Sequence, residues 1–153
     1  MTIEARLKEL GLALPSTPPA AGNYIGSRQS DNILFVGGNT GRVNGVRKFN
    51  GKVGAEVTLE QAYEMARFCA LNHIAGIKAV LGDLDRVDHM IMLTGYVSVA
   101  PGFTQLPAVV NGASDLLVKL WGERGEHTRC AIGVASLGGD APVETTLVLR
   151  VKN

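Results

Sequence analysis

Apolar residues recur every three or four positions in three stretches of the chain, and each stretch predicts an amphipathic helix. The first covers residues 2–10. The second begins after Thr58, which forms a T-x-x-Q capping box with Gln61, and continues over residues 59–81 to a glycine. The third runs over about residues 106–121, with a proline in its first turn and a glycine past its end.

The segments between these helices have the apolar runs and turn residues of β-strands. The run at residues 33–37 is continuously apolar, as expected of a strand covered on both faces. Near the C-terminus, two apolar segments flank a Gly-Gly turn and suggest a hairpin. The expected strands are residues 23–27, 33–37, 42–49, 87–99 and the two arms of the hairpin around residues 138–139.

This order of elements predicts an α+β fold, in which a mixed sheet carries two helices on one face and an extra N-terminal helix. Two helices cannot cover both faces, so we expect other subunits to bury the second face. At 153 residues the chain is most simply a single domain over residues 1–153. Residues 1–18 would form its N-terminal helix and a proline-rich arm, where Pro15, Pro18 and Pro19 exclude a helix.

Composition narrows the class of protein. The formal net charge of +1 gives no broad field to attract nucleic acid or an anionic membrane. No apolar run reaches the roughly 18 residues that span a bilayer, and no secretory signal is visible. Cys69 and Cys130 form no C-x-x-C pair, so no structural zinc is expected. We expect a soluble, cytoplasmic protein without a nucleic-acid or membrane partner.

Two charged residues are the main candidates for chemistry. Arg129 stands at the mouth of an otherwise apolar strand, and Glu144 stands near the start of the strand that returns. The planar fork of an arginine suits a carboxylate, and a glutamate beside an apolar wall can act as a general base. A structural ion pair between them explains the residues equally well. His127, two positions before Arg129, is interpreted as a bystander.

Other candidates are few, since no nucleotide-binding, P-loop, zinc-protease or serine-hydrolase motif is present. Gly37 and Gly38 at a strand end would let a ligand approach the main chain, although a plain turn explains them too. Asn111 is polar within a helix and indicates a specific hydrogen bond. His73 is interpreted as a hydrogen-bonded structural residue, and the aspartates of residues 83–85 as solvated turn residues.

Several motifs together resemble one family. They are P-A-A-G-N-Y at 19–24, L-F-V-G-G-N at 34–39, the long helix after Thr58, G-D-L-D-R-V at 82–87, F-T…V-N at 103–111 and R-C-A-I-G-V-A-S-L…V-E at 129–144. On these motifs, residues 20–151 resemble the Rid (YjgF-type) family of small trimeric enamine and imine deaminases, which have a chorismate-mutase-like fold. The N-terminal helix and residues 111–117 are similar to a branch labelled "YjgF-like, putative endoribonuclease".

The resemblance implies a function. Arg129 would bind the carboxylate of a 2-imino or 2-enamino acid, such as 2-iminopropanoate or 2-iminobutanoate. Glu144 would orient the water that attacks the imine carbon, releasing a 2-oxo acid and ammonia without a metal or cofactor. The pocket would lie between neighbouring subunits of a homotrimer. Its substrate-binding residues would be Tyr24, Gly37, Gly38, Asn111 and Ala131.

The chain also departs from the family pattern. Many members carry cysteine where this chain has Ala131, so no thiol-dependent mechanism is expected, and Gly138 replaces the usual proline of the turn. These changes leave the substrate open. Two other functions stay open as well: a non-catalytic trimer that binds small carboxylic or 2-oxo acids, and an endoribonuclease or translation inhibitor. The near-neutral charge and scarce aromatic residues argue against extensive RNA binding.

Overall fold

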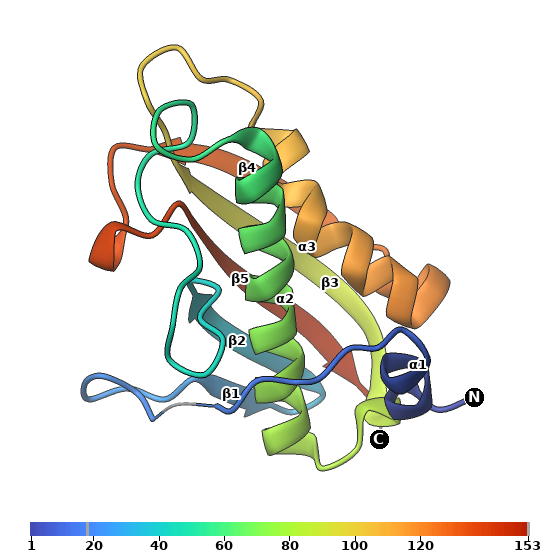
Figure 1. Cartoon of the computed structure of the whole chain (residues 1–153). Helices are drawn as coiled ribbons and strands as arrows, with labels where there is room; N and C mark the ends of the chain where they lie inside the picture. The colour runs from blue at the N-terminus through green and yellow to red at the C-terminus, as the bar shows by residue number, and fades with distance from the viewer. Residues whose placement is uncertain (18, 153) are drawn as a thin grey trace.

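A computed structural model describes residues 1–17 and 19–152, so Pro18 of the expected arm lies outside the described residues. The predicted α+β architecture is confirmed: helices α2 and α3 cross one face of a five-stranded mixed sheet, and the short α1 lies at one end (Figure 1). The elements are α1 (Ile3–Glu9), β1 (Ser27–Ser30), β2 (Ile33–Asn39), α2 (Leu59–Leu81), η1 (Leu84–Arg86), β3 (Val87–Ser98), α3 (Leu106–Trp121), η2 (Gly122–Gly125), β4 (Thr128–Val134), η3 (Gly138–Asp140) and β5 (Val143–Val151).

Capping residues fix the ends of α2 as the sequence predicts. The backbone N–H of Gln61 donates to Thr58 Oγ1 at 3.2 Å, and the N–H of Thr58 donates to Gln61 Oε1 at 3.0 Å. This reciprocal pair satisfies N–H groups that have no partner inside the helix. At the other end Gly82 is left-handed, with φ of 75°, which a glycine adopts without strain.

The expected hairpin of the last two strands is wrong. The strands are ordered β1-β2-β5-β3-β4, so β3 lies between β4 and β5. The chain leaves β3, forms α3 and returns as β4 parallel to β3, which is a β-α-β crossover. β5 then enters the middle of the sheet antiparallel to both neighbours.

Burial explains why β5 is central and β4 is at the edge. Alternate residues of β5 from Val143 to Val151 are buried, whereas no residue of β4 is buried. A strand that buries one whole side must pack against the helix layer along its full length. The Gly-Gly turn is part of the longer loop 135–142, which carries the chain from β4 past β3 to β5.

Two further strand predictions are wrong. Residues 23–26 form an irregular segment with bends at residues 23, 24 and 26, and strand β1 begins only at Ser27. Residues 42–49 contain a single bridge between Val43 and Val46. Asn44 and Gly45, with φ of 51° and 81°, turn the chain immediately between them. This Asn-Gly pair is itself a turn signal, and it leaves the segment too short for a strand.

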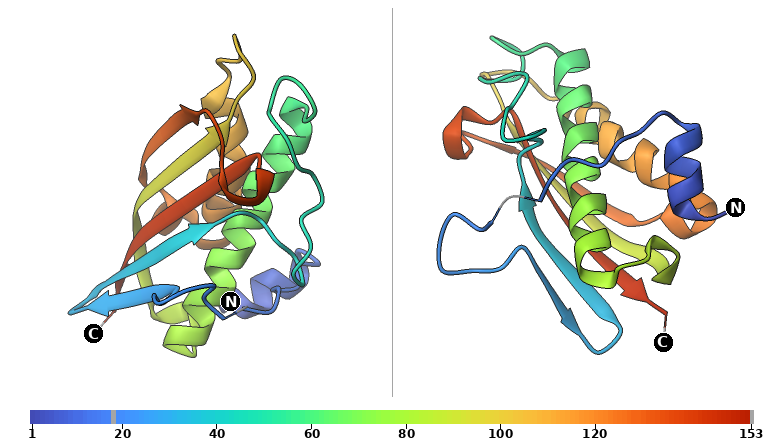
Figure 2. Two further views of the ribbon diagram at one scale, coloured as in Figure 1. Left: turned by 90° about the vertical axis from the view of Figure 1, so that its left-hand side faces the viewer. Right: turned by 60° about the horizontal axis from the view of Figure 1, so that its bottom comes forward.

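The two faces of the sheet differ. One face packs against α2 and α3, while no helix of residues 1–17 and 19–152 covers the other (Figure 2). On this open face Phe35, Met92 and Ile132 are 49%, 37% and 42% exposed. Val148 lies between Phe35 and Met92 in register, which makes an apolar row across three strands. The continuously apolar β2 is thus covered on one face only within the chain; burial of the second face by other subunits stays a prediction.

Helices α2 and α3 approach each other closely at Gly112. A Cβ atom added there would overlap the carbonyl oxygen of Tyr63 and lie 2.9 Å from its carbonyl carbon. By contrast, a Cβ added at Gly76, within α2, would meet only Ser27 Oγ, at 3.8 Å. The helix layer therefore requires glycine at position 112 and tolerates a side chain at position 76.

We expect Gly112→Ala to lower the free energy of unfolding by about 1–3 kcal/mol or more, because the backbone of α2 must move. Gly76→Ala is the matched control, and it should raise the free energy of unfolding by about 0.5–1 kcal/mol, since alanine favours a helix. Denaturant unfolding of both variants checks this. Equal effects of the two substitutions would contradict the close approach of the helices.

Candidate active site in two halves

Arg129 is held at the edge of the sheet by α3. Its Nη1 donates to Asn111 Oδ1 at 2.7 Å and to Ser114 Oγ at 3.1 Å, and its Nη2 donates to the carbonyl oxygen of Pro107 at 3.3 Å. The structure thus brings Arg129 together with Asn111. Sequence reasoning missed Ser114 and Pro107, whose only signal is that they lie within one helical turn of Asn111.

All three acceptors of Arg129 are neutral. The salt bridges of the described residues do not include Arg129, so its charge is not neutralised by a carboxylate of the same chain. A guanidinium has five N–H donors, of which three are occupied here, so two remain for a ligand. A fixed, uncompensated guanidinium with two available donors can bind an anion, and its fork suits a carboxylate.

Glu144 belongs to a second group of residues. Its carboxylate covers the main chain of Gly38, where an added Cβ would lie 3.1 Å from Glu144 Cδ. Tyr96 of β3 lies directly opposite Glu144 in register. Among residues 1–17 and 19–152 no hydrogen bond or salt bridge to the Glu144 side chain occurs. The carboxylate is therefore available to a water molecule or a ligand.

The hypothesis that one hairpin brings Arg129 and Glu144 together is wrong. They are two strands and three register positions apart, because Leu93 of β3 pairs with Arg129 and Tyr96 pairs with Glu144. With strands about 4.8 Å apart and a rise of about 3.3 Å per residue, their Cα atoms are separated by roughly 14 Å.

Arg129 and Glu144 also point to opposite faces of the sheet. The Arg129 side chain reaches α3, on the helix face. Thr145, next to Glu144, bonds His73 of α2 on that same helix face, so the Glu144 side chain faces the open side. An ion pair between Arg129 and Glu144 is therefore not formed within the chain.

Three predicted pocket residues do lie together. Tyr24, Gly37 and Gly38 line a cavity of about 250 Å³ between the N-terminal arm, the end of β2 and α2, to which Asn39 and Asn72 also contribute. Neither Arg129 nor Glu144 lines this cavity.

Ala131 lies elsewhere, on the Arg129 side. It pairs with Gly95 of β3 and packs against the core under α3. Within one chain the candidate site residues therefore divide into an Arg129 half, with Asn111 and Ala131, and a Glu144 half, with Gly38.

A buried histidine forms hydrogen bonds to the residues that follow Gly38 and Glu144. His73 Nδ1 lies 3.1 Å from Asn39 Nδ2, and His73 Nε2 lies 2.8 Å from Thr145 Oγ1. Asn39 and Thr145 follow Gly38 and Glu144 directly, so the histidine ties together the two strands that carry them. Burial lowers the pKa of His73 to about 4, which keeps the imidazole neutral at neutral pH.

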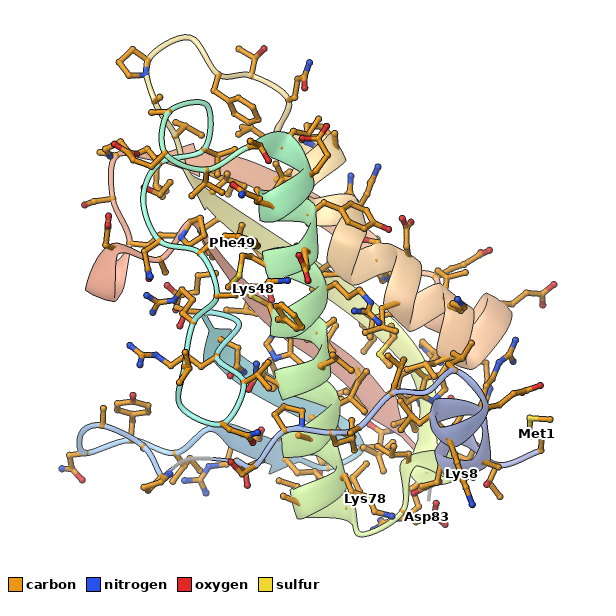
Figure 3. All side chains as sticks on the ribbon, in the orientation of Figure 1. Met1, Lys8, Lys48, Phe49, Lys78 and Asp83 are labelled. Carbon is orange, nitrogen blue, oxygen red and sulfur yellow. The ribbon has the colours of Figure 1, made fainter. Side chains whose placement is uncertain are left out.

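Glu4 lies beside the two aspartates that the sequence interprets as solvated turn residues. Asp83 and Asp85 come within 4.8 Å of Glu4, which the sequence did not place near them. Glu4 already accepts hydrogen bonds from Lys78 Nζ and from the backbone N–H of Leu84. Figure 3 shows Lys78 and Asp83 at the C-terminal end of α2. The Glu4 carboxylate thus has a structural role, which is to dock α1 onto the end of α2.

No helix within residues 1–17 and 19–152 is long and apolar enough to cross a membrane.

Comparison with known proteins gives a consistent result. The family described as "YjgF/chorismate mutase-like, putative endoribonuclease" matches residues 4–138. Protein TCP17 of Trypanosoma cruzi is 38% identical over 152 residues, which are 99% of this chain and 95% of that protein.

Two crystal structures share the fold over the whole chain. A putative endoribonuclease from Shewanella oneidensis is 30% identical with a TM-score of 0.95, covering 99% of this chain and 100% of that one. The protein Atu1372 from Agrobacterium tumefaciens, of unknown function, is 38% identical with a TM-score of 0.91, covering 99% and 93%.

The neutral state of His73 makes stability depend on pH. Between pH 6.5 and about 4 the unfolded chain binds a proton at this histidine and the folded chain does not, so stability falls as the pH falls. Over this window we expect the free energy of unfolding to drop by roughly 3 kcal/mol from this group.

Denaturant unfolding at pH 7 and pH 4.5 measures the drop. His73→Gln should lose this part of the pH dependence, whereas the half-exposed His89→Gln should keep it. A wild-type slope in His73→Gln would show that His73 is not held neutral.

Proposed function

This chain belongs to the YjgF/chorismate mutase-like family, and we propose that it is a hydrolytic deaminase of 2-imino or 2-enamino acids such as 2-iminopropanoate or 2-iminobutanoate. The observation that carries the proposal is Arg129, a guanidinium anchored only by neutral acceptors. Such a group binds the carboxylate of a small acid with its two available N–H donors.

The reaction adds water to the imine and releases ammonia. The carboxylate of Glu144 takes a proton from water as the water oxygen bonds to the imine carbon, and the carboxylic acid so formed gives that proton to the imine nitrogen. The carbinolamine then collapses: Glu144 moves the hydroxyl proton to the amino nitrogen, the C=O bond forms as the C–N bond breaks, and the products are a 2-oxo acid and ammonia. Each step needs only a carboxylate base and a fixed substrate carboxylate, which are the groups of the two halves.

For the two halves to act on one substrate, a second subunit would have to supply one of them. Arg129 lies on the edge strand β4, where the sheet of one chain ends, and Glu144 lies on the open face. We propose that the Arg129 half of one subunit meets the Glu144 half of its neighbour in a homotrimer. The apolar row on the open face supports this assembly, since exposed apolar surface of this kind marks an interface.

A second function is a trimer that binds small carboxylic or 2-oxo acids without turnover. It is favoured by the separation of Arg129 from Glu144, because the Arg129 half can bind an acid by itself. The endoribonuclease named in the family description is a further alternative. RNA cleavage by the purified protein, if unchanged in Arg129→Ala, would place that activity at another site.

Substitution of Arg129 tests the carboxylate site. We expect Arg129→Ala to weaken binding of 2-oxobutanoate by at least about 30-fold, since removing one partner of a charged hydrogen-bonded pair costs about 2 kcal/mol or more. Arg129→Lys should lose most of the activity, because one ammonium cannot replace a bidentate fork. Calorimetry measures binding, and ammonia release from freshly generated imino acid measures turnover.

Asn111→Asp is the matched variant for Arg129→Ala, because it changes the charge of the site and leaves Arg129 in place. It keeps an acceptor beside Arg129 but supplies an internal carboxylate, which should compete with the ligand and weaken binding while the fold is retained. If Arg129→Ala releases ammonia at the wild-type rate, the deaminase proposal fails.

Mixing two inactive variants tests the shared site. Arg129→Ala and Glu144→Gln should each be inactive alone, and Glu144→Gln should still bind 2-oxobutanoate. After unfolding and refolding a 1:1 mixture, random trimers with sites between subunits should recover about one quarter of the wild-type activity. Sites contained within single chains would recover none, and a monomer in sedimentation would also exclude the shared site.

A further inference from the structure

Arg129 is the end of a longer chain of hydrogen bonds that begins at His127. His127 Nδ1 lies 2.7 Å from the carbonyl oxygen of Gly125, and a carbonyl only accepts, so Nδ1 carries the proton. His127 Nε2 lies 2.9 Å from Ser114 Oγ. In the neutral imidazole Nε2 is an acceptor, so the Ser114 hydroxyl donates to it.

The direction of these hydrogen bonds decides whether Ser114 Oγ acts as a donor or as an acceptor toward Arg129. Because its proton points to His127, the lone pairs of Ser114 Oγ are free to accept from Arg129 Nη1, at 3.1 Å. Burial lowers the pKa of His127, and the nearby Arg129 charge lowers it further, against a hydrogen bond to Gly125 that raises it. The neutral imidazole is thus the form present at neutral pH.

Without His127 the hydroxyl would turn elsewhere. Ser114 lies in the interior of α3, and a serine there commonly donates to the carbonyl four residues back, here that of Val110. That rotation moves Oγ away from Arg129. The guanidinium would keep Asn111 and the weaker bond to Pro107, and its plane would be free to swing.

We propose that His127, acting through Ser114, is a positioning residue for Arg129: it fixes the guanidinium plane so that the two available donors face the carboxylate of the ligand. The choice of ligand rests on the function proposed above. The arrangement itself stands on the geometry of four groups, and His127 touches neither the ligand nor the reacting atoms.

Two amide variants separate the two bonds of His127. The side-chain amide of glutamine lies as many bonds from the backbone as His127 Nε2, and that of asparagine as many as Nδ1. His127→Gln therefore keeps an acceptor for Ser114, whereas His127→Asn keeps only the donor to Gly125. Thermal unfolding establishes that both variants fold.

We expect His127→Asn and Ser114→Ala each to raise the Kd for 2-oxobutanoate, and the KM of turnover, by about 10-fold, while kcat changes less. His127→Gln should restore most of the affinity. The double variant His127→Asn/Ser114→Ala should be no worse than either single variant, because both break the same chain. Independent, additive losses would overturn the proposal.

A second readout does not depend on the ligand. In 15N NMR spectra of the free protein, rotation of the Arg129 guanidinium should be slow in wild type and His127→Gln and fast in His127→Asn and Ser114→Ala. If wild type neither binds nor turns over these acids, the proposed function fails and the rotation rates alone decide the inference. Unchanged rates in His127→Asn and Ser114→Ala would overturn it even where deaminase activity is found.

Covalent labelling distinguishes another role for the same pair. A serine bonded to a neutral histidine is also the arrangement of an activated nucleophile. Ser114 already accepts from Arg129 in mid-helix, so we expect no reaction with a fluorophosphonate probe. Labelling of Ser114 that is lost in His127→Asn would make it a nucleophile and overturn a positioning role.

Discussion

The alternation of side chains along β5 is the constraint from which the rest of the site follows. Val143, Thr145 and Leu147 are fully buried under the helix layer, and a strand cannot turn one residue inward without turning its neighbours outward. The Glu144 side chain therefore points to the open face of the sheet. Arg129 lies on an edge strand, and its side chain points to the other face, toward α3. No rotamer change within one chain can bring the two groups together.

The regular elements were predictable because their signals are local. The capping box of Thr58 and Gln61 and the glycine that ends α2 act within a few residues, and the structure has the helix where they place it. The Asn44-Gly45 turn is also a local signal, and it interrupts the strand predicted over residues 42–49. The α+β architecture followed from the order of elements and the number of helices.

The position of β5 could not be predicted in the same way. A Gly-Gly turn between two apolar segments is compatible with a hairpin or with a loop that passes another strand, and only the packing of β3 decides between them. The same limit applies to the site. Ser114 and His127 are thirteen residues apart and meet only because α3 lies along β4. The candidate residues Arg129 and Glu144 could be named from sequence, but their opposite faces could not.

The two halves of the site are built on different helices. Every acceptor that fixes Arg129 belongs to α3, whereas the Asn39–His73–Thr145 chain that supports the Glu144 half is attached to α2. A substitution in α3 that alters the acceptors of Arg129 therefore leaves the hydrogen bonds of the Glu144 half intact. If the proposed function holds, selection on ligand affinity and selection on catalysis act on separate segments of the gene. Under the function proposed above, a descendant of this chain that lost Glu144 would keep the acid-binding Arg129 half, and one that changed its α3 acceptors would change its ligand while keeping Glu144.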